Sequence, residues 1–394
     1  MRNGWTIKPL GEVGIFQRGG GFLKNDFVED GFPCIHYGQI HTVFGVATEK
    51  HLKCIPKTLA LNKSKLATTG DVILAITSED VECSCKCTAW LGNYDIAIGS
   101  HAAIYHHNLN PKFVSYYFRG PFFNRAKQKF THGIKVIEIK PSDIATICIA
   151  YPSLDEQTLI VEELDLLNNV IAEKESQLND LDALAQSIFY EMFGDPVSNE
   201  KGWPVKAIKE SVEEMFLGPF GSSLKTDSYV PKEQSYCMVY EQKHAIKKTL
   251  KQYNHYINKD KFNMLKRFSV GPGDFIMSCR GTIGEIFELP KDAPNGIIHP
   301  SLMKIRLKEG VYSHEFFKVV LRQVVAKQEM NGGVVKMAVT AKKLGQIQIV
   351  APPMDAQIEF NRKIEKIEEQ KELIKQSISD MQTLLDKRMS DYFN

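Results

Sequence analysis

The side chains that could do chemistry in this 394-residue chain are basic, amide and aromatic groups in glycine-rich loops. Arginine, lysine and glutamine can match the hydrogen-bonding pattern of base edges, and lysine beside a glycine-rich backbone suits phosphate. Such groups recur at matching places in both halves of the chain, which favours a nucleic-acid surface over unrelated solvated loops. We therefore predict nucleic-acid contacts from Arg18, Lys24, His36, Tyr37, Gln39, Lys86, Lys225, Tyr240, Gln242, Lys243, Lys247, Lys248, Arg280 and Thr282.

Patterns for catalysis or metal binding are weaker. The segment GPFGSSLKT from Gly218 lacks the spacing of a nucleotide-binding P-loop, and APPM from Ala351 lacks the Asn or Asp of an amino-methyltransferase motif. Cys83, Cys85 and Cys87, with Cys34 or Cys54, could form a tetrahedral zinc site, but C-x₂-C spacing is absent. Buried cysteines acting as small hydrophobes explain this cluster better. We predict neither catalytic residues nor a bound metal.

The chain contains an internal repeat. GWTIKPL from Gly4 matches GWPVKAI from Gly202, and GDVI from Gly70 matches GDFI from Gly273. His101 is matched with His299, and YPSLDEQ, ending at Gln157, with PPMDAQ, ending at Gln357. The protein is therefore expected to be two copies of one unit, each a globular block followed by a helix.

Two long helices are predicted by apolar residues spaced alternately three and four apart, the pattern of a heptad seam. Asp155 and Asp355 are the expected N-caps. A seam can also pack on its own domain, but the charged flanks and matched lengths favour an antiparallel pair of rods about 58 Å long. The predicted seam residues are Leu164, Leu167, Ile171, Leu178, Leu181, Ile364, Ile367, Ile374, Ile378 and Met381.

The globular blocks are predicted to be mixed α/β domains, so the fold class is α+β with two pseudo-symmetric domains separated by an antiparallel coiled coil. Strands are expected over 71–77, 95–106, 274–279 and 301–307, and helices over 111–129 and 313–330. The predicted boundaries are 1–153 and 196–353 for the domains, and 154–195 and 354–394 for the helices.

Charge alternates along these segments, although the whole chain carries only +2. The domain segments carry +5 and +9, and the helical segments carry −10 and −2. Basic domains favour a polyanion partner, whereas acidic helices favour protein partners. With 43% hydrophobic residues, eight cysteines, no apolar run of 18 residues and no signal-peptide core, the chain is expected to be soluble and cytoplasmic.

These features together resemble the specificity subunits of type I restriction–modification systems. The resemblance covers the whole chain and rests on the two domain openings, the Gly-Asp strands, the helix entries YPSLDEQ and PPMDAQ, and the exit IFYEMFGDP from Ile188. It implies two target-recognition domains, each reading half of a bipartite, asymmetric DNA site, and a helix pair that sets the spacer.

The resemblance also implies partners. Two methyltransferase subunits would use S-adenosylmethionine to methylate adenine N6, and restriction–translocase subunits would use ATP and Mg²⁺ in defence against foreign DNA. The chain itself would be non-catalytic and bind no cofactor. Two alternatives remain open: a coiled-coil adaptor that binds no DNA, and a stand-alone DNA-modifying enzyme. Salt-dependent binding to duplex DNA separates a DNA-binding subunit from an adaptor.

Overall fold

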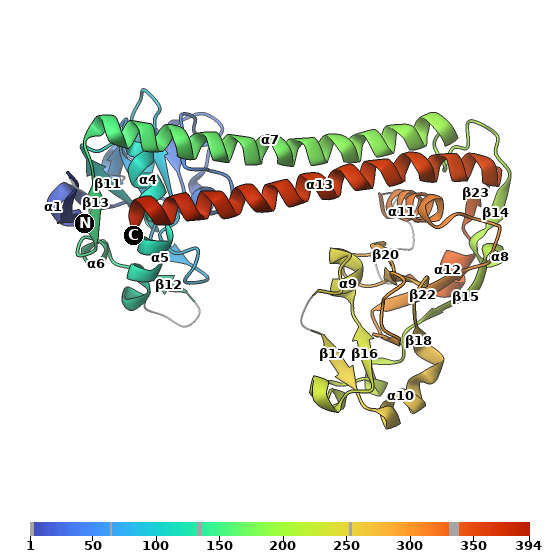
Figure 1. Ribbon diagram of the computed structural model, residues 1–394. Helices are drawn as coiled ribbons and strands as arrows, with labels where there is room; N and C mark the ends of the chain where they lie inside the picture. The colour runs from blue at the N-terminus through green and yellow to red at the C-terminus, as the bar shows by residue number, and fades with distance from the viewer. Residues whose placement is uncertain (1–3, 64, 132–135, 252–253, 331–338) are drawn as a thin grey trace. The chain divides into compact units, whose positions relative to one another are not determined.

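The computed structural model describes residues 4–63, 65–131, 136–251, 254–330 and 339–394 (Figure 1). The chain forms two compact units. Unit 1 combines Met1–Gln177 with Ile374–Asn394, and unit 2 is the continuous segment Leu178–Leu373. Each long helix is therefore shared between the two units. Among the described residues, no helix is both long and apolar enough to cross a membrane.

Unit 1 is built on two sheets whose central strands are buried apolar runs. Its described strands have the orders β2-β11-β7-β9-β4 and β5-β3-β10-β6, with the small pairs β1-β13 and β12-β8. The strands are β1 (Thr6–Pro9), β2 (Gly14–Arg18), β3 (Phe32–Ile35), β4 (Ala47–Thr48), β5 (Lys53–Ile55), β6 (Lys65–Ala67), β7 (Val72–Ala75), β8 (Thr77–Ser78), β9 (Cys87–Trp90), β10 (Ile96–Ile98), β11 (Ala102–His107), β12 (Ile137–Glu138) and β13 (Cys148–Tyr151).

The helices of unit 1 are short apart from the part of the long pair that it contains. They are α1 (Leu10–Val13), α2 (Tyr37–Thr42), α3 (Lys57–Lys63), α4 (Pro111–Arg119), α5 (Pro121–Lys127) and α6 (Pro141–Ile144), with 3₁₀ turns η1 (Lys24–Asp26) and η2 (Gln128–Phe130). The single helix expected over 111–129 is wrong in detail, because Gly120 and Pro121 separate α4 from α5. The strand expected over 95–106 is two strands in different sheets, β10 and β11, joined by a turn at Gly99.

Unit 2 repeats this plan with fewer strands. Its described sheets are β15-β22-β19-β20, β17-β16-β21-β18 and the pair β14-β23. The strands are β14 (Val205–Ala207), β15 (Val212–Leu217), β16 (Cys237–Tyr240), β17 (His255–Ile257), β18 (Ser269–Val270), β19 (Phe275–Ser278), β20 (Ile286–Glu288), β21 (Gly296–Ile298), β22 (Leu302–Leu307) and β23 (Gln348–Val350). The helices are α8 (Ile208–Ser211), α9 (Gln242–Lys247), α10 (Lys259–Leu265), α11 (His314–Met330) and α12 (Ala341–Gly345), with 3₁₀ turns η3 (Gly221–Ser223), η4 (Thr226–Ser228), η5 (Lys232–Gln234) and η6 (Lys266–Phe268).

Backbone hydrogen bonds align the two units more closely than the sequence does. The His101 carbonyl accepts from the amide of Ile76, and the Ser301 carbonyl accepts from the amide of Cys279, at the same place in each unit. His101 therefore corresponds to Ser301, and Gly99 corresponds to His299. The sequence match of His101 with His299 is wrong by two residues, because a residue-type match cannot fix the register of a short turn.

The long helices are α7 (Leu154–Phe193) and α13 (Met354–Phe393), and they run antiparallel within each unit (Figure 1). In unit 1 the Glu163 carboxylate binds Arg388 and Tyr392, and in unit 2 the Lys371 ammonium lies 2.8 Å from the Asp182 carboxylate. All ten predicted seam residues are buried or half-buried. Because α7 begins at Leu154, Asp155 lies in its first turn and is not the N-cap, and the same holds for Asp355 in α13.

Matching glutamines anchor the start of each long helix. Gln157 and Gln357 are both almost fully buried. Gln157 accepts from the amide of Asn110 at 2.8 Å and donates to the Pro152 carbonyl at 2.9 Å. Gln357 makes the same contacts with Ser313 and Pro352, at 2.9 and 2.8 Å. The last residue of the sequence matches YPSLDEQ and PPMDAQ is therefore a buried tie between the long helix and its domain.

Matching phenylalanines bury the end of each long helix. Phe193 of α7 packs against Phe316 in unit 2, with ring centroids 4.7 Å apart, and Phe393 of α13 packs against Phe113 in unit 1 at 5.1 Å. Each unit thus holds the beginning of one long helix and the end of the other. The helix ends belong to the hydrophobic cores, not to the surface.

Candidate nucleic-acid interface

The predicted contact residues gather where a buried strand ends and a short helix begins. In unit 1, β3 is followed by His36 as the N-cap of α2, and in unit 2, β16 is followed by Glu241 as the N-cap of α9. Both N-caps also close a capping box with the third residue of the helix. The two units therefore carry different polar side chains at the same N-cap position.

In unit 1 this position carries a cluster of aromatic and imidazole rings. The Tyr37 ring lies 4.4 Å from the His36 ring and 5.1 Å from the His101 ring, measured between centroids. His101 Nδ1 is 3.2 Å from the hydroxyl of Thr77, the first residue of β8. Burial lowers the pKa of His36, helped by the nearby His101 and Lys24. His36 therefore stays neutral more readily than a free histidine, and a neutral imidazole both donates and accepts hydrogen bonds.

Two other predicted residues of unit 1 hold this cluster in place. The Gln39 side chain accepts from the His36 amide at 2.8 Å, and the Lys86 ammonium donates to the His41 carbonyl at 2.7 Å. Arg18 donates to the Ser100 carbonyl at 3.3 Å and pairs with Glu138 at 2.8 Å, and about half of its side chain is exposed. These contacts assign Gln39 and Lys86 to positioning the loops, and leave part of Arg18 open to solvent.

In unit 2 a glutamine fixes the loop that carries Arg280 and Thr282. Gln242 Nε2 donates to the Arg280 carbonyl at 2.6 Å and to the Thr282 carbonyl at 3.4 Å. Gly281 and Gly284 have φ of +64° and +83°, a left-handed conformation that other residues rarely adopt. The side chains of Arg280 and Thr282 are exposed. The loop is therefore preorganised, with its arginine side chain in solvent.

Glu241 is a polar centre of unit 2 that the sequence prediction omitted. Its carboxylate lies 2.8 Å from the Lys243 ammonium and 2.9 Å from His255 Nδ1, and the His255 ring stacks on Tyr229 at 4.3 Å. Burial alone would raise the pKa of Glu241, but the hydrogen bonds from Lys243 and His255 bring it below its ordinary value. No sequence signal joins these residues, because the pairing of β16 with β17 brings His255 beside Glu241.

Tyr240 was predicted to contact nucleic acid, and this prediction is wrong. Its side chain is completely buried, and its hydroxyl donates to the Pro294 carbonyl at 2.5 Å. Tyr240 ends the fully buried strand β16, so it belongs to the core and has no surface to offer DNA. Lys225, Lys247 and Lys248 are exposed, and Lys248 lies 3.7 Å from the Glu285 carboxylate.

The cysteines near the interface of unit 1 differ in their surroundings. Cys83 is exposed, whereas Cys85 and Cys87 are buried, and burial raises the pKa of Cys85 to about 12. Burial therefore keeps the Cys85 thiol protonated in the protein without metal. Among the described residues, no three His, Cys, Asp or Glu side chains are grouped to hold a metal ion.

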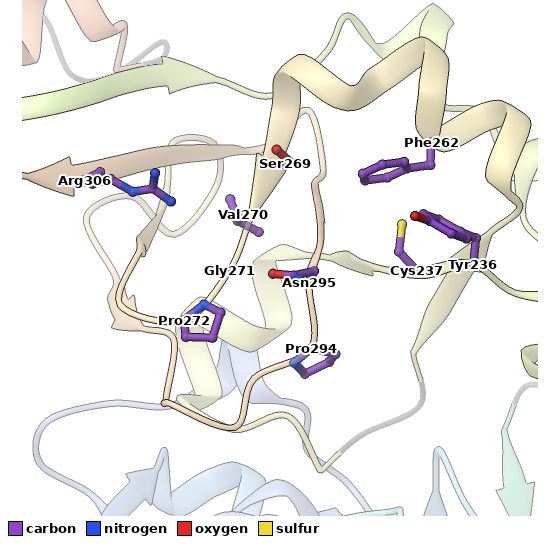
Figure 2. A pocket seen from close by; sticks show the side chains of 10 residues that line it. All are labelled: Tyr236, Cys237, Phe262, Ser269, Val270, Gly271, Pro272, Pro294, Asn295 and Arg306. Carbon is purple, nitrogen blue, oxygen red and sulfur yellow. The ribbon is translucent and has the colours of Figure 1, made fainter.

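A cavity of about 670 Å³ lies where strands β16, β19 and β21 of unit 2 begin (Figure 2). The candidate interface lies where the same strands end. Gly271 and Pro272, just before β19, and Pro294 and Asn295, just before β21, line it together with Arg306. The Arg306 guanidinium is bound to the buried Asp274 by hydrogen bonds of 2.6 and 2.9 Å. The candidate contact Arg280 and the neighbouring His299 follow the opposite ends of β19 and β21. We therefore place the cavity outside the candidate interface.

Solved structures of other proteins share this architecture over the whole length of the chain. No family model matches the chain. The S subunit of a type I restriction–modification system from M. genitalium aligns over 100% of this chain and 97% of its own, with a TM-score of 0.51 and 13% identity. A chain from structural work on the assembly and conformational transition of a type I system aligns over 100% and 98%, with a TM-score of 0.61 and 18% identity. The chain has the fold of a type I specificity subunit.

Sequence similarity points to the same proteins. The StySPI specificity subunit of Salmonella potsdam, a type I restriction enzyme, is 24% identical over 173 residues. The match covers 42% of this chain and 37% of the relative's length. The predicted α+β fold with an antiparallel helix pair is confirmed. The N-cap positions of His36 and Glu241 are equivalent in the two units.

Proposed function

We propose that this protein is the DNA-recognition subunit of a type I restriction–modification complex and carries no catalytic residue of its own. The observation that supports this most strongly is the pairing of a whole-chain specificity-subunit fold with polar side chains presented at the same strand ends of both units. Because His36 occupies this position in unit 1 and Glu241 in unit 2, the two halves of the DNA site differ in sequence.

The partners follow from the same proposal. Two methyltransferase subunits bind the long helices, whose first segment carries most of the negative charge, and they use S-adenosylmethionine to methylate adenine N6. Restriction–translocase subunits supply the ATP- and Mg²⁺-dependent activities. The helix pair sets the number of base pairs between the half-sites. The complex acts in the cytoplasm, where the chromosome and incoming DNA meet.

Methylome sequencing tests this proposal. The chain is expressed with its methyltransferase subunit in a host that lacks type I systems, and N6-methyladenine is mapped across the genome. We expect one asymmetric, bipartite motif to be methylated, and methylation to vanish when this chain is omitted. Methylation that persists without the chain, or never appears with it, would contradict the proposal.

Binding assays separate the remaining alternatives. The purified complex should bind a duplex that carries the motif more tightly than a scrambled duplex, and its affinity should fall steeply with salt as phosphate counterions are released. A complex that forms but binds neither duplex would favour the coiled-coil adaptor. Methyl transfer by this chain alone would favour a stand-alone enzyme.

A further inference from the structure

A single aromatic side chain stands out on the surface of unit 2. Phe220 is 87% exposed, more than any other large apolar side chain in the described part of the chain. It lies between Pro219 and Gly221 in the loop that follows β15. A partner that buries a solvated phenyl ring lowers the free energy of the complex by removing apolar surface from water.

The loop holds the Phe220 ring outward through an ordered base. The Gly218 amide donates to the Leu302 carbonyl at 2.9 Å, and a Cβ at position 218 would lie 2.3 Å from the His299 carbonyl oxygen. On the other side, the Ser223 amide donates to the Phe220 carbonyl at 2.8 Å, and Leu224 is buried. The exposure of Phe220 is therefore a property of a fixed loop.

This loop adjoins the candidate interface. Gly218 packs against the turn that contains His299, and the His299 amide donates at 2.8 Å to the carbonyl of Tyr240, the residue before Glu241. Lys225 follows in the same loop and is exposed. Phe220 thus lies in a loop whose base packs at the candidate interface and which also carries a basic residue, whereas its own ring is apolar.

Unit 1 folds without a counterpart of Phe220. The equivalent loop runs from Gly19 to Val28, whereas that of unit 2 runs from Gly218 to Val230 and is three residues longer. In unit 1, Phe22 fills the buried site that Leu224 fills in unit 2. The additional residues around Phe220 are therefore not needed to close this fold.

We propose that Phe220 is a specificity-determining residue whose ring contacts the C5-methyl group of a thymine in the half-site bound by unit 2. This inference rests on the proposed function. The thymine methyl is the apolar group that a base pair presents in the major groove, and phenylalanine is among the side chains that contact it. The neighbouring basic residues fix the DNA, and Phe220 supplies selectivity at one position.

Deoxyuridine substitution tests the contact, because uracil pairs like thymine but lacks the methyl group. The complex with its methyltransferase subunits is titrated with duplexes in which each thymine of that half-site is replaced in turn. For the unaltered complex we expect one position at which uracil weakens binding by about 5- to 10-fold. In Phe220→Ala, affinity for the thymine duplex should fall by a similar factor, and thymine and uracil should bind equally at that position.

Two variants serve as controls. Phe220→Leu keeps an apolar side chain and should retain most of the discrimination. Met264→Ala removes another exposed side chain of unit 2, 77% exposed on α10, and should leave binding unchanged. If Phe220→Ala retains the thymine preference, or if it changes DNA bending without affecting that preference, the thymine contact is wrong. If the unaltered complex binds no specific sequence, the proposed function itself fails.

Discussion

At the scale of single residues, one position in the fold carries different chemistry in the two units. His36 and Glu241 occupy the same N-cap, but an imidazole both donates and accepts, whereas a carboxylate only accepts. A carboxylate suits the exocyclic amino group of cytosine, which a histidine does not select in the same way. Under the proposed function, we therefore expect this N-cap to help set the base that each unit recognises, although Glu241 also binds Lys243 and His255.

Arg280 and Lys225 should differ in what their loss does to DNA binding. Arg280 projects from a loop held by Gln242, so Arg280→Ala should cost about 1–3 kcal/mol and relax one base position. Lys225 lies on an exposed loop, so Lys225→Ala should weaken all sequences alike and reduce the salt dependence. Titration of a set of single-base variants at several salt concentrations measures both effects. Equal loss across all bases in Arg280→Ala would move Arg280 to the phosphate backbone.

His107 should make unit 1 sensitive to acid. Burial lowers its pKa from 6.5 to about 4, its Nδ1 accepts from the Leu109 amide at 3.1 Å, and its Nε2 has no hydrogen-bond partner among the described residues. A buried neutral histidine contributes stability that is complete above pH 6.5 and is lost as the pH falls towards 4, to a total of roughly 3 kcal/mol.

Replacing His107 tests this linkage. His107→Gln cannot be protonated, so we expect a smaller loss of thermal stability between pH 6.5 and pH 4.5 than in the unaltered chain. Calorimetry at several pH values measures the difference. Parallel curves for the two proteins would show that other groups cause the acid sensitivity.

At the scale of elements, the seam of the long helices separates buried from solvated leucines only two residues apart. Leu164 is completely buried in the core of unit 1, whereas Leu166 is 64% exposed. Leu164→Ala should lower the free energy of unfolding by about 2–5 kcal/mol, because it leaves a cavity in a packed core. Leu166→Ala is the matched control and should change stability by less than about 0.5 kcal/mol. Denaturant titration of both variants measures the difference, and equal stability loss would show that position 164 is not buried in a packed core.

Sequence patterns predicted elements well where the pattern was long, and poorly where tertiary contacts decide the outcome. The seam repeats over many turns, so the long helices were predictable. The break between α4 and α5 rests on Gly120 and Pro121, a local signal that apolar spacing obscured. The register of His101 against Ser301 depends on backbone pairing in each unit.

The candidate interface shows the same division. The loops around His36 and Arg280 were predictable from composition. Tyr240 was misassigned because the polar residues that follow it conceal the end of a fully buried strand. The association of Tyr229 and His255 with Glu241 depends on strand pairing that no local pattern reveals.

At the scale of the whole molecule, the proposed spacer role predicts a measurable change in the DNA site. Inserting one heptad after both Gln177 and Ser377 keeps the seam in phase and lengthens the helix pair by about 10 Å. At about 3.4 Å per base pair, the methylated motif should keep both half-sites and gain roughly three base pairs of spacer. Methylome sequencing reads this directly.

Insertion into one helix alone is the control. A heptad after Gln177 only leaves α13 too short for its partner, so the matched contacts Glu163–Arg388 and Asp182–Lys371 cannot both form. Methylation of any spacing should then be lost. Activity of the double insertion on the original spacing would contradict the spacer role without affecting DNA recognition.

The division of the long helices between the units has a consequence for how the protein is made. Unit 1 needs residues 374–394 to cover Phe113 and its neighbours, yet the ribosome synthesises all of unit 2 before that segment emerges. At about 5–20 residues per second, the gap lasts roughly 10–40 s. During that time the first half of the nascent chain exposes an apolar surface shaped for the end of a long helix. Until its own α13 emerges, this surface can bind the end of α13 from a neighbouring chain. Newly made copies on one polysome can therefore form domain-swapped pairs in which this helix end is exchanged.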